Sequence, residues 1–253
     1  MNILEKILNV KRQEIQQIKD FEFGEMAGQN RSLKDALSKP GISVIAEIKM
    51  KSPSEGEIFS YADPAHIAKG YESAGAAAIS VLTDQSFFGG SLDILNSVRN
   101  AVSIPVIRKD FIINQKQISE TIHYNGDAFL LIADALDQDS LQQLMNIGKM
   151  AGLEFLVEYH AEKHAEFIFA LNPEIVGINC RNLKTMATDI TYFEKMISSL
   201  PSNSVKVAES GIHTSDDLEY VSDLGYDAAL IGTSLMKTGN PEKALGTLLG
   251  EIS

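Results

Sequence analysis

The 253-residue sequence predicts one α/β domain in which eight strand–helix units close into a barrel. Short apolar runs recur along the chain after residue 42, and most are followed by a segment with helix start signals. Strands that alternate with helices form parallel sheets, and continuous apolar strands are typical of sheets covered on both faces. Because a length of about 250 residues is typical of this architecture, we expect a single (β/α)8 TIM barrel at 43–253, after an N-terminal helical extension at 1–42.

The extension contains two predicted helices. Residues 1–20 form an amphipathic pattern, with an apolar stripe of Leu4, Ile7, Leu8, Ile15 and Ile18 opposite the charges. Ser32–Leu37 begins with a Ser-x-x-Asp sequence that resembles a capping box. A helix on a membrane surface is the functional alternative for residues 1–20. The polar face mixes acids with bases, whereas membrane-surface helices are usually basic, so we expect both helices to pack on the barrel.

The eight predicted strands are the apolar runs at 43–49, 77–82, 105–109, 127–133, 153–158, 175–180, 205–210 and 227–232. Between them, Asp63-Pro64 and Asn240-Pro241 each place a helix-capping residue before a proline, and Ser91 and Thr214 are further candidate caps. No low-complexity linker interrupts the series. One domain is therefore predicted.

Composition limits the classes of function. A net charge of -12 argues against nucleic acid, whose binding depends on Lys and Arg, although a few local cations could hold a small anion. No uncharged apolar run is long enough to span a membrane, and the start lacks the apolar core of a signal peptide. The single cysteine, Cys180, excludes an intramolecular disulfide and fits a reducing compartment. We expect a cytoplasmic protein without nucleic-acid or membrane partners.

Charged residues and one asparagine stand at the carboxyl ends of the predicted strands. They are the carboxylates Glu47, Glu158 and Glu209, the cations Lys49, Lys109 and Arg181, and Asn179. On the first strand Glu47 and Lys49 share a face by alternation, and a structural ion pair is the alternative to a functional role. Barrel active sites lie at the carboxyl ends of the strands. The pattern therefore predicts an acid/base site that holds an anion.

Two loops after the seventh and eighth strands favour a phosphate ligand. Ser210-Gly211 follows one strand and Gly232-Thr233-Ser234 the other. In barrels these two loops often bind phosphate through backbone N–H groups and a short helix N-terminus. Each segment alone is an ordinary turn, but the pair in this position indicates a phosphate site.

Other residues have structural alternatives. His160 and His164 have the i, i+4 spacing of a metal pair, but without a third ligand a solvated helix face is the better interpretation. Cys180 should point into packing. Phe87-Phe88 and Phe111 could belong to the core or form an aromatic wall for a flat ligand, in which case Phe88 and Phe111 would contact substrate.

The same segments make the chain resemble the indole-3-glycerol-phosphate synthase family along essentially its whole length. The resemblance is carried by 46–54, 81–84 with Phe87-Phe88, 108–112, 156–158, 178–183 and 208–212. It implies ring closure of 1-(2-carboxyphenylamino)-1-deoxyribulose 5-phosphate, with release of carbon dioxide and water. It implies no metal or organic cofactor, and we expect a monomer rather than an oligomer.

The resemblance also implies roles for single residues. Lys109 would be the general acid at the ketone oxygen and Glu158 the base that assists proton loss. Glu47 and Lys49 would position and polarise the substrate, Lys49 also being a candidate second acid. The hydroxyl, anilino and carboxylate groups of the substrate would be bound by Asn179, Arg181, Glu209 and Ser210. Its phosphate would be bound by Gly211, Gly232 and Ser234. The loop 50–61 would close over the substrate and bring Ser52 to it.

The chain departs from the commoner family pattern at Glu55, Gly89, Asn114-Gln115 and Cys180, none of which is a proposed catalytic residue. Two rival interpretations are open. One is the phosphoribosylanthranilate isomerase of the same pathway. That enzyme usually has a cysteine and an aspartate as its acid/base pair, and Glu47 and Lys109 fit this pattern poorly. The other is a non-catalytic barrel that binds a phosphate ligand, which would be expected to have lost some of the charged residues. A turnover assay discriminates between them.

Overall fold

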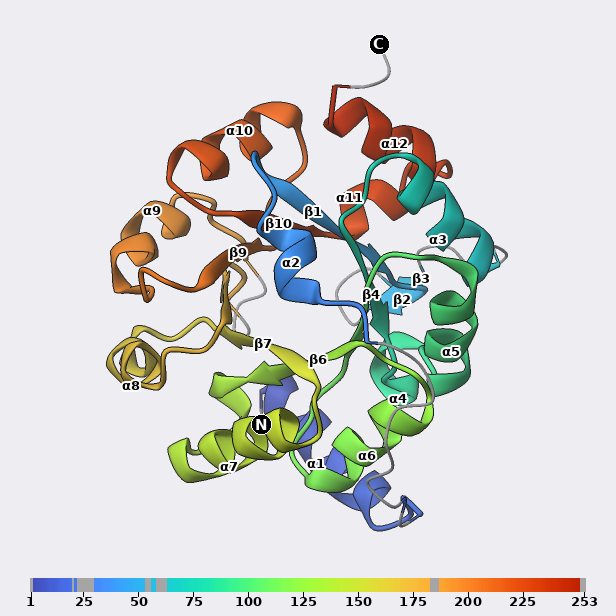
Figure 1. Cartoon of the computed structure of the whole chain (residues 1–253), viewed down its shortest axis with the longest axis vertical. Coiled ribbons are helices and arrows are strands. Elements are labelled where there is room, and N and C mark those ends of the chain that lie inside the picture. The colour runs from blue at the N-terminus through green and yellow to red at the C-terminus, as the bar shows by residue number, and fades with distance from the viewer. Residues whose placement is uncertain are drawn as a thin grey trace.

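The computed structural model describes residues 2–19, 21, 30–52, 56–57, 63–182 and 187–250. Its centre is a closed parallel barrel in the order β1-β10-β9-β8-β7-β6-β5-β4 (Figure 1). The barrel strands are β1 (Ser43–Ile48), β4 (Ala78–Leu82), β5 (Val106–Lys109), β6 (Ala128–Ile132), β7 (Glu154–Tyr159), β8 (Ile175–Asn179), β9 (Val205–Glu209) and β10 (Ala228–Ile231). The prediction of a (β/α)8 barrel is confirmed, and each strand lies where an apolar run was identified.

The helices cover the outside of the barrel (Figure 1). They are α3 (Pro64–Ser73), α4 (Gln85–Phe88), α5 (Leu92–Ala101), α6 (Gln115–His123), α7 (Gln138–Met150), α8 (Ala165–Leu171), α9 (Tyr192–Met196), α10 (Ser215–Asp223), α11 (Thr233–Met236) and α12 (Pro241–Leu248). Short 3₁₀ turns occur at η1 (Ala133–Ala135), η2 (Glu162–His164) and η3 (Ile197–Ser199). The predicted caps Asp63, Ser91, Thr214 and Asn240 each accept a backbone N–H from the first turn of their helix. These four predictions are confirmed.

Alternation along the strands separates two buried clusters. In β1, Ile45 belongs to the cluster inside the barrel, whereas Val44 and Ala46 pack with the surrounding helices. All six residues of β1 are buried, as expected for a parallel strand covered on both faces. Because the next residue of the inward series is Glu47, this alternation delivers its carboxylate to the inside of the barrel at the strand's carboxyl end.

The N-terminal extension contacts both ends of the barrel. Helix α2 (Leu33–Leu37) crosses the front of the barrel in Figure 1, where Leu33 and Leu37 are fully buried in the cluster inside it. Helix α1 (Ile3–Ile15) lies partly behind α6 and α7 in the same view. It is shorter than the predicted helix at 1–20, because Gln16 ends the hydrogen-bonded series. Its apolar stripe packs on the barrel, as predicted.

A short hairpin follows β1. Strands β2 (Lys51–Ser52) and β3 (Gly56–Glu57) pair in antiparallel register. The predicted lid at 50–61 lies mostly outside the described residues, as do the side chain of Ser52 and the whole of Glu55. In the part of the chain that is described, no helix is both long and apolar enough to cross a bilayer.

Candidate active site

The carboxyl ends of the barrel strands surround a pocket with an empty volume of about 1200 Å³, including its open mouth. Apart from Ser52, whose side chain is not described, every predicted site residue lines it. These residues are Glu47, Lys49, Phe88, Lys109, Phe111, Glu158, Asn179, Arg181, Glu209, Ser210, Gly211, Gly232 and Ser234. Parallel strands bring their carboxyl ends to one face, which explains why residues far apart in the sequence meet here.

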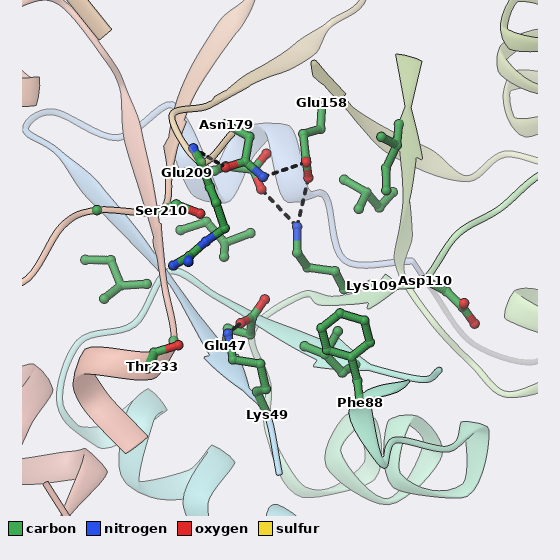
Figure 2. Close-up of a pocket in the computed structure, with 18 of the residues that line it drawn as sticks. Glu47, Lys49, Phe88, Lys109, Asp110, Glu158, Asn179, Glu209, Ser210 and Thr233 are labelled. Atoms are coloured by element: carbon green, nitrogen blue, oxygen red, sulfur yellow. Dashed lines mark hydrogen bonds and ion pairs between the residues drawn. The ribbon is translucent and has the colours of Figure 1, made fainter. Parts of the chain in front are cut away.

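Lys109, the last residue of β5, lies at the centre of the polar cluster (Figure 2). Its Nζ donates to Glu158 Oε2 at 3.0 Å and to Glu209 Oε2 at 2.9 Å. Burial alone would lower the pKa of this ammonium, but the carboxylates of Glu158, Glu209 and Glu47 together raise it. Lys109 is therefore a charged donor with its proton held inside the pocket.

The pKa values of Glu158 and Glu209 are shifted in opposite directions. Burial would raise the pKa of Glu158, but Lys109 and the Asn179 amide, which donates to Oε1 at 2.8 Å, lower it. Burial and the Glu158 charge raise the pKa of Glu209 to about 8, although Lys109 opposes this shift. The same ammonium contacts both carboxyl groups, and the surroundings favour the ionised form of Glu158 and the protonated form of Glu209.

Asn179 is itself fixed by the backbone that follows it. Its Oδ1 accepts the backbone N–H of Arg181 at 3.0 Å, so its amide nitrogen must face Glu158. Gly177, two residues earlier on β8, makes room for Glu209, because a Cβ at this position would collide with the Glu209 carboxyl. The two alternate residues of β8 therefore set the positions of both glutamates.

Glu209→Gln is expected to lose less stability than the wild type as the pH rises from about 5 to 8. The folded-state pKa of Glu209 lies above its ordinary value of 4.5, so over this range the unfolded chain ionises while the folded chain retains the proton. Unfolding is therefore favoured progressively as pH rises towards 8. With about 1.4 kcal/mol per unit of pKa, the effect should reach a few kcal/mol.

Urea unfolding midpoints at a series of pH values measure this effect, with the exposed Glu219→Gln on α10 as the matched control. Wild type and Glu219→Gln should lose stability in parallel, and Glu209→Gln should lose less. Parallel curves for all three proteins would show that Glu209 is ionised in the folded state.

Glu47 and Lys49 form the ion pair expected from their shared strand face. Lys49 Nζ lies 2.7 Å from Glu47 Oε1, and both side chains are largely buried in the pocket. The Glu47 carboxylate also packs against the backbone at Gly232, where a Cβ would lie only 2.5 Å from Oε1. The Glu47 carboxylate thus packs where β10 ends, and both members of the pair line the pocket.

Phe88 and Phe111 form the aromatic side of the pocket. Phe88 is the last residue of α4 and Phe111 follows β5, and their ring centroids are 6.2 Å apart with an interplanar angle of 33°. Both are half-buried and line the pocket, whereas Phe87 does not line it. Phe111 also packs against the cluster inside the barrel, so it belongs to both the core and the pocket lining, and contact of Phe88 and Phe111 with a flat ligand stays a prediction.

The two glycine-containing loops converge at another side of the pocket. Ser210 and Gly211 both have positive φ, 72° and 74°, and Gly232 precedes α11. The Ser234 hydroxyl donates to the Ile212 carbonyl at 3.2 Å and so ties the loops together. Their convergence agrees with the geometry expected of a phosphate site.

Two other sequence interpretations have different outcomes. Cys180 packs into the core as predicted, and burial raises the pKa of its thiol to about 11. The solvated helix face predicted for His160 and His164 is wrong. His160 Nδ1 lies 2.8 Å from the Asn179 carbonyl and its ring stacks on Tyr192, while His164 is close to Asp134. Within the described residues no group of three or more His, Cys, Asp or Glu side chains could hold a metal ion.

Sequence reasoning missed the apolar lining of the pocket. Part of it comes from the carboxyl-terminal halves of the strands, at Leu82, Leu130, Ile132, Leu230 and Ile231, and Thr233 adds a hydroxyl. Another part comes from Ile3, Leu4 and Ile7 on α1 and from Ile212 after β9. Leu4 and Ile7 were visible as members of an apolar stripe, but the stripe alone does not say which surface it covers.

The comparisons with known proteins agree with the site. A family model described as "Indole-3-glycerol phosphate synthase" matches residues 4–248. Proteins of that name from Halalkalibacterium halodurans and Shouchella clausii are 43% and 42% identical, each over 98% of this chain and over 97% and 98% of the relative. The one from Mycolicibacterium gilvum is 46% identical over 85% of this chain and 79% of the relative.

Two solved structures share the fold at low identity. A 3-hexulose-6-phosphate synthase superposes with a TM-score of 0.64 at 12% identity, covering 84% of this chain and 100% of that one. A thiamine phosphate pyrophosphorylase from Pyrococcus furiosus gives 0.62 at 14% identity, covering 87% and 97%. These two show the barrel alone. Because the family model spans 4–248 and relatives at 42–46% identity share its name, the chain belongs to the indole-3-glycerol phosphate synthase family.

Proposed function

We propose that this chain catalyses ring closure of 1-(2-carboxyphenylamino)-1-deoxyribulose 5-phosphate to indole-3-glycerol phosphate, the carboxy-lyase step of tryptophan biosynthesis. The observation that carries the proposal is the Lys109 ammonium held between Glu158 and Glu209 at the carboxyl ends of the strands, in a chain of this family. The reaction needs an acid at a ketone oxygen and a base for a later proton loss. Lys109 is the candidate acid and Glu158 the candidate base, and the two are joined by a hydrogen bond of 3.0 Å.

In the first step the ring carbon that bears the carboxylate bonds to the ketone carbon. Lys109 gives a proton to the ketone oxygen as negative charge develops there. The bond to the carboxylate then breaks, and its electron pair restores the aromatic ring as carbon dioxide leaves. In the last step the new hydroxyl leaves as water with a proton from an acid, for which Lys49 is the candidate. Glu158 takes the proton whose loss forms the indole double bond.

Electrostatics favour this substrate over a neutral one. Lys49, Lys109 and Arg181 line the pocket beside the carboxyl groups of Glu47, Asp110, Glu158 and Glu209, and of these Glu209 has its pKa raised to about 8. Three cations thus line one pocket on a protein whose net charge is -12. A substrate with one carboxylate and one phosphate could pair with these cations in a partly desolvated site, where such interactions are stronger than in water.

Binding would place the aromatic ring against Phe88 and Phe111 and the phosphate at Gly211, Gly232 and Ser234. Asn179, Arg181, Glu209 and Ser210 would then contact the carboxylate, anilino and hydroxyl groups between those ends. The cytoplasmic location, the monomeric state, the absence of a cofactor and the closing role of Ser52 stay predictions.

A turnover assay with the anilino-deoxyribulose phosphate tests the proposal. The chain has no tryptophan, so indole fluorescence from the product would appear over a tyrosine background. Appearance of that fluorescence together with release of carbon dioxide is expected. Absence of both from folded protein at substrate saturation would sink the proposal.

Removal of the phosphate from a substrate analogue is expected to weaken binding by at least about 100-fold, since a phosphate at a helix N-terminus makes several charge-assisted contacts. Inorganic phosphate should compete with the intact analogue at millimolar concentration. Titration calorimetry with the two analogues measures both effects. Equal affinities for the two would show that the loops of Gly211 and Gly232 do not hold the phosphate.

A further inference from the structure

Lys11 on α1 is buried, with 4% of its surface exposed, and the mechanism above does not use it. Its Nζ lies 2.7 Å from Glu14 Oε2, 2.9 Å from Asp84 Oδ2 and 2.9 Å from Asp110 Oδ1. Lysine is rarely buried unless it is paired. Glu14 belongs to the same helix, but Asp84 and Asp110 follow two different barrel strands. One ammonium therefore joins three separate parts of the chain.

Asp110 connects Lys11 to the proposed acid. It immediately follows Lys109, and its side chain points away from the Lys109 ammonium (Figure 2). Its Oδ1 accepts the backbone N–H of Phe111 at 2.8 Å, and its Oδ2 accepts from the Thr83 hydroxyl at 2.7 Å. Burial would raise the pKa of Asp110, but Arg108 and Lys11 lower it to about 2. The backbone that carries Lys109 is thus anchored through an ionised aspartate.

Asp84 connects Lys11 to the aromatic wall. It is fully buried and caps α4, because its Oδ1 accepts the backbone N–H groups of Phe87 at 2.7 Å and Phe88 at 3.3 Å. Its other oxygen, Oδ2, faces Lys11. The orientation of the short helix that presents Phe88 therefore depends on a carboxylate that Lys11 neutralises.

The helix that carries Lys11 contributes to the pocket itself. Ile7 lies one turn before Lys11, and Ile3 and Leu4 lie one turn earlier still; all three line the pocket. An anchor at Lys11 fixes α1 relative to β4 and β5, and so fixes these apolar side chains over the pocket. Each of the three segments that meet at the Lys11 ammonium thus presents a pocket residue.

We propose that Lys11 is a positioning residue of this active site, which holds Lys109, Phe88 and the α1 wall in one arrangement through Asp110 and Asp84. The inference rests on the proposed function. Without the Lys11 ammonium, the buried carboxylates of Asp84 and Asp110 would lose the cation that they share. Their uncompensated charge would be relieved by movement of the side chains or by entry of water. A displacement of about 1 Å at reacting groups can cost on the order of 100-fold in rate.

Lys11→Met tests this role against Lys6→Met, which removes an equal charge from an exposed position on the same helix. Both variants are assayed at a temperature where circular dichroism shows them folded. Lys11→Met should lower kcat/KM by roughly 10–100-fold, with changes in both kcat and KM, and Lys11→Arg should recover part of the loss. Lys6→Met should match wild type. A purely structural lysine would lower the unfolding temperature without altering kcat or KM of the folded enzyme.

Asp84→Asn tests the same positioning role if Lys11→Met does not fold. Asparagine keeps the oxygen that caps α4 but turns an amide nitrogen towards the Lys11 ammonium, so Phe88 should shift and KM should rise. Folded Lys11→Met or Asp84→Asn with the kcat and KM of Lys6→Met would overturn the proposal. An inactive wild type would instead refute the proposed function, and the two failures are thereby distinguished.

Discussion

Lys109→Met is expected to lower kcat by about 10²–10⁴-fold, the contribution usual for one positioned proton donor. Its Nζ is bound by Glu158 and Glu209 at 3.0 and 2.9 Å, and the pKa of the ammonium is raised, so the proton stays in the pocket until the substrate oxygen develops charge. Methionine has a similar volume and no proton to give. Circular dichroism should show a folded barrel, because the variant removes charge from a solvent-connected pocket and leaves the apolar core unchanged.

Single-turnover indole fluorescence measures the loss, with the exposed Lys149→Met on α7 as the matched control. The pH profile gives a second readout. Lys109 lowers the pKa of Glu158, so its removal should raise that pKa and move the acid limb of the residual activity to higher pH. Wild-type kcat in folded Lys109→Met would show that another group protonates the ketone.

The barrel could be predicted because its strands are buried on both faces. A strand such as β9 (Val205–Glu209) then becomes a continuous apolar run, and the predicted range 205–210 differs from it by one residue. The site followed from the same feature, since parallel strands present their carboxyl ends on one face. Both faces of each strand are otherwise apolar, so charged residues at the strand ends, such as Glu47 and Lys109, are expected to face the pocket.

The path of the N-terminal extension could not be predicted in the same way. Its stripe indicated an apolar contact, but the choice between the two ends of the barrel depends on distant partners such as Asp84 and Asp110. A usable signal was present, because Lys11 stands among Ile7, Leu8 and Ile15 on the stripe. A lysine in an apolar stripe indicates a buried ion pair, although the sequence does not name the partner.

Protonation states were also beyond sequence reasoning. The alternation of β7 and β9 predicts that Glu158 and Glu209 reach the same pocket, but their opposite pKa shifts depend on distances to one shared ammonium. His160 illustrates the same limit. Its ring is held by the Asn179 carbonyl and Tyr192, contacts between segments that no local spacing reveals.

Glu158→Gln is expected to lower kcat by about 10²–10³-fold while KM changes little, because the amide cannot accept the proton lost in the last step. Glu158 Oε2 accepts from Lys109 and Oε1 from Asn179, whereas glutamine offers only one acceptor. The fold should persist, since loss of the Glu158 charge lowers the pKa of Glu209 and lets that carboxylate pair with Lys109. The exposed Glu166→Gln on α8 is the control. Pre-steady-state kinetics should show carbon dioxide released faster than indole fluorescence appears, and equal slowing of both steps would assign the base to a different group.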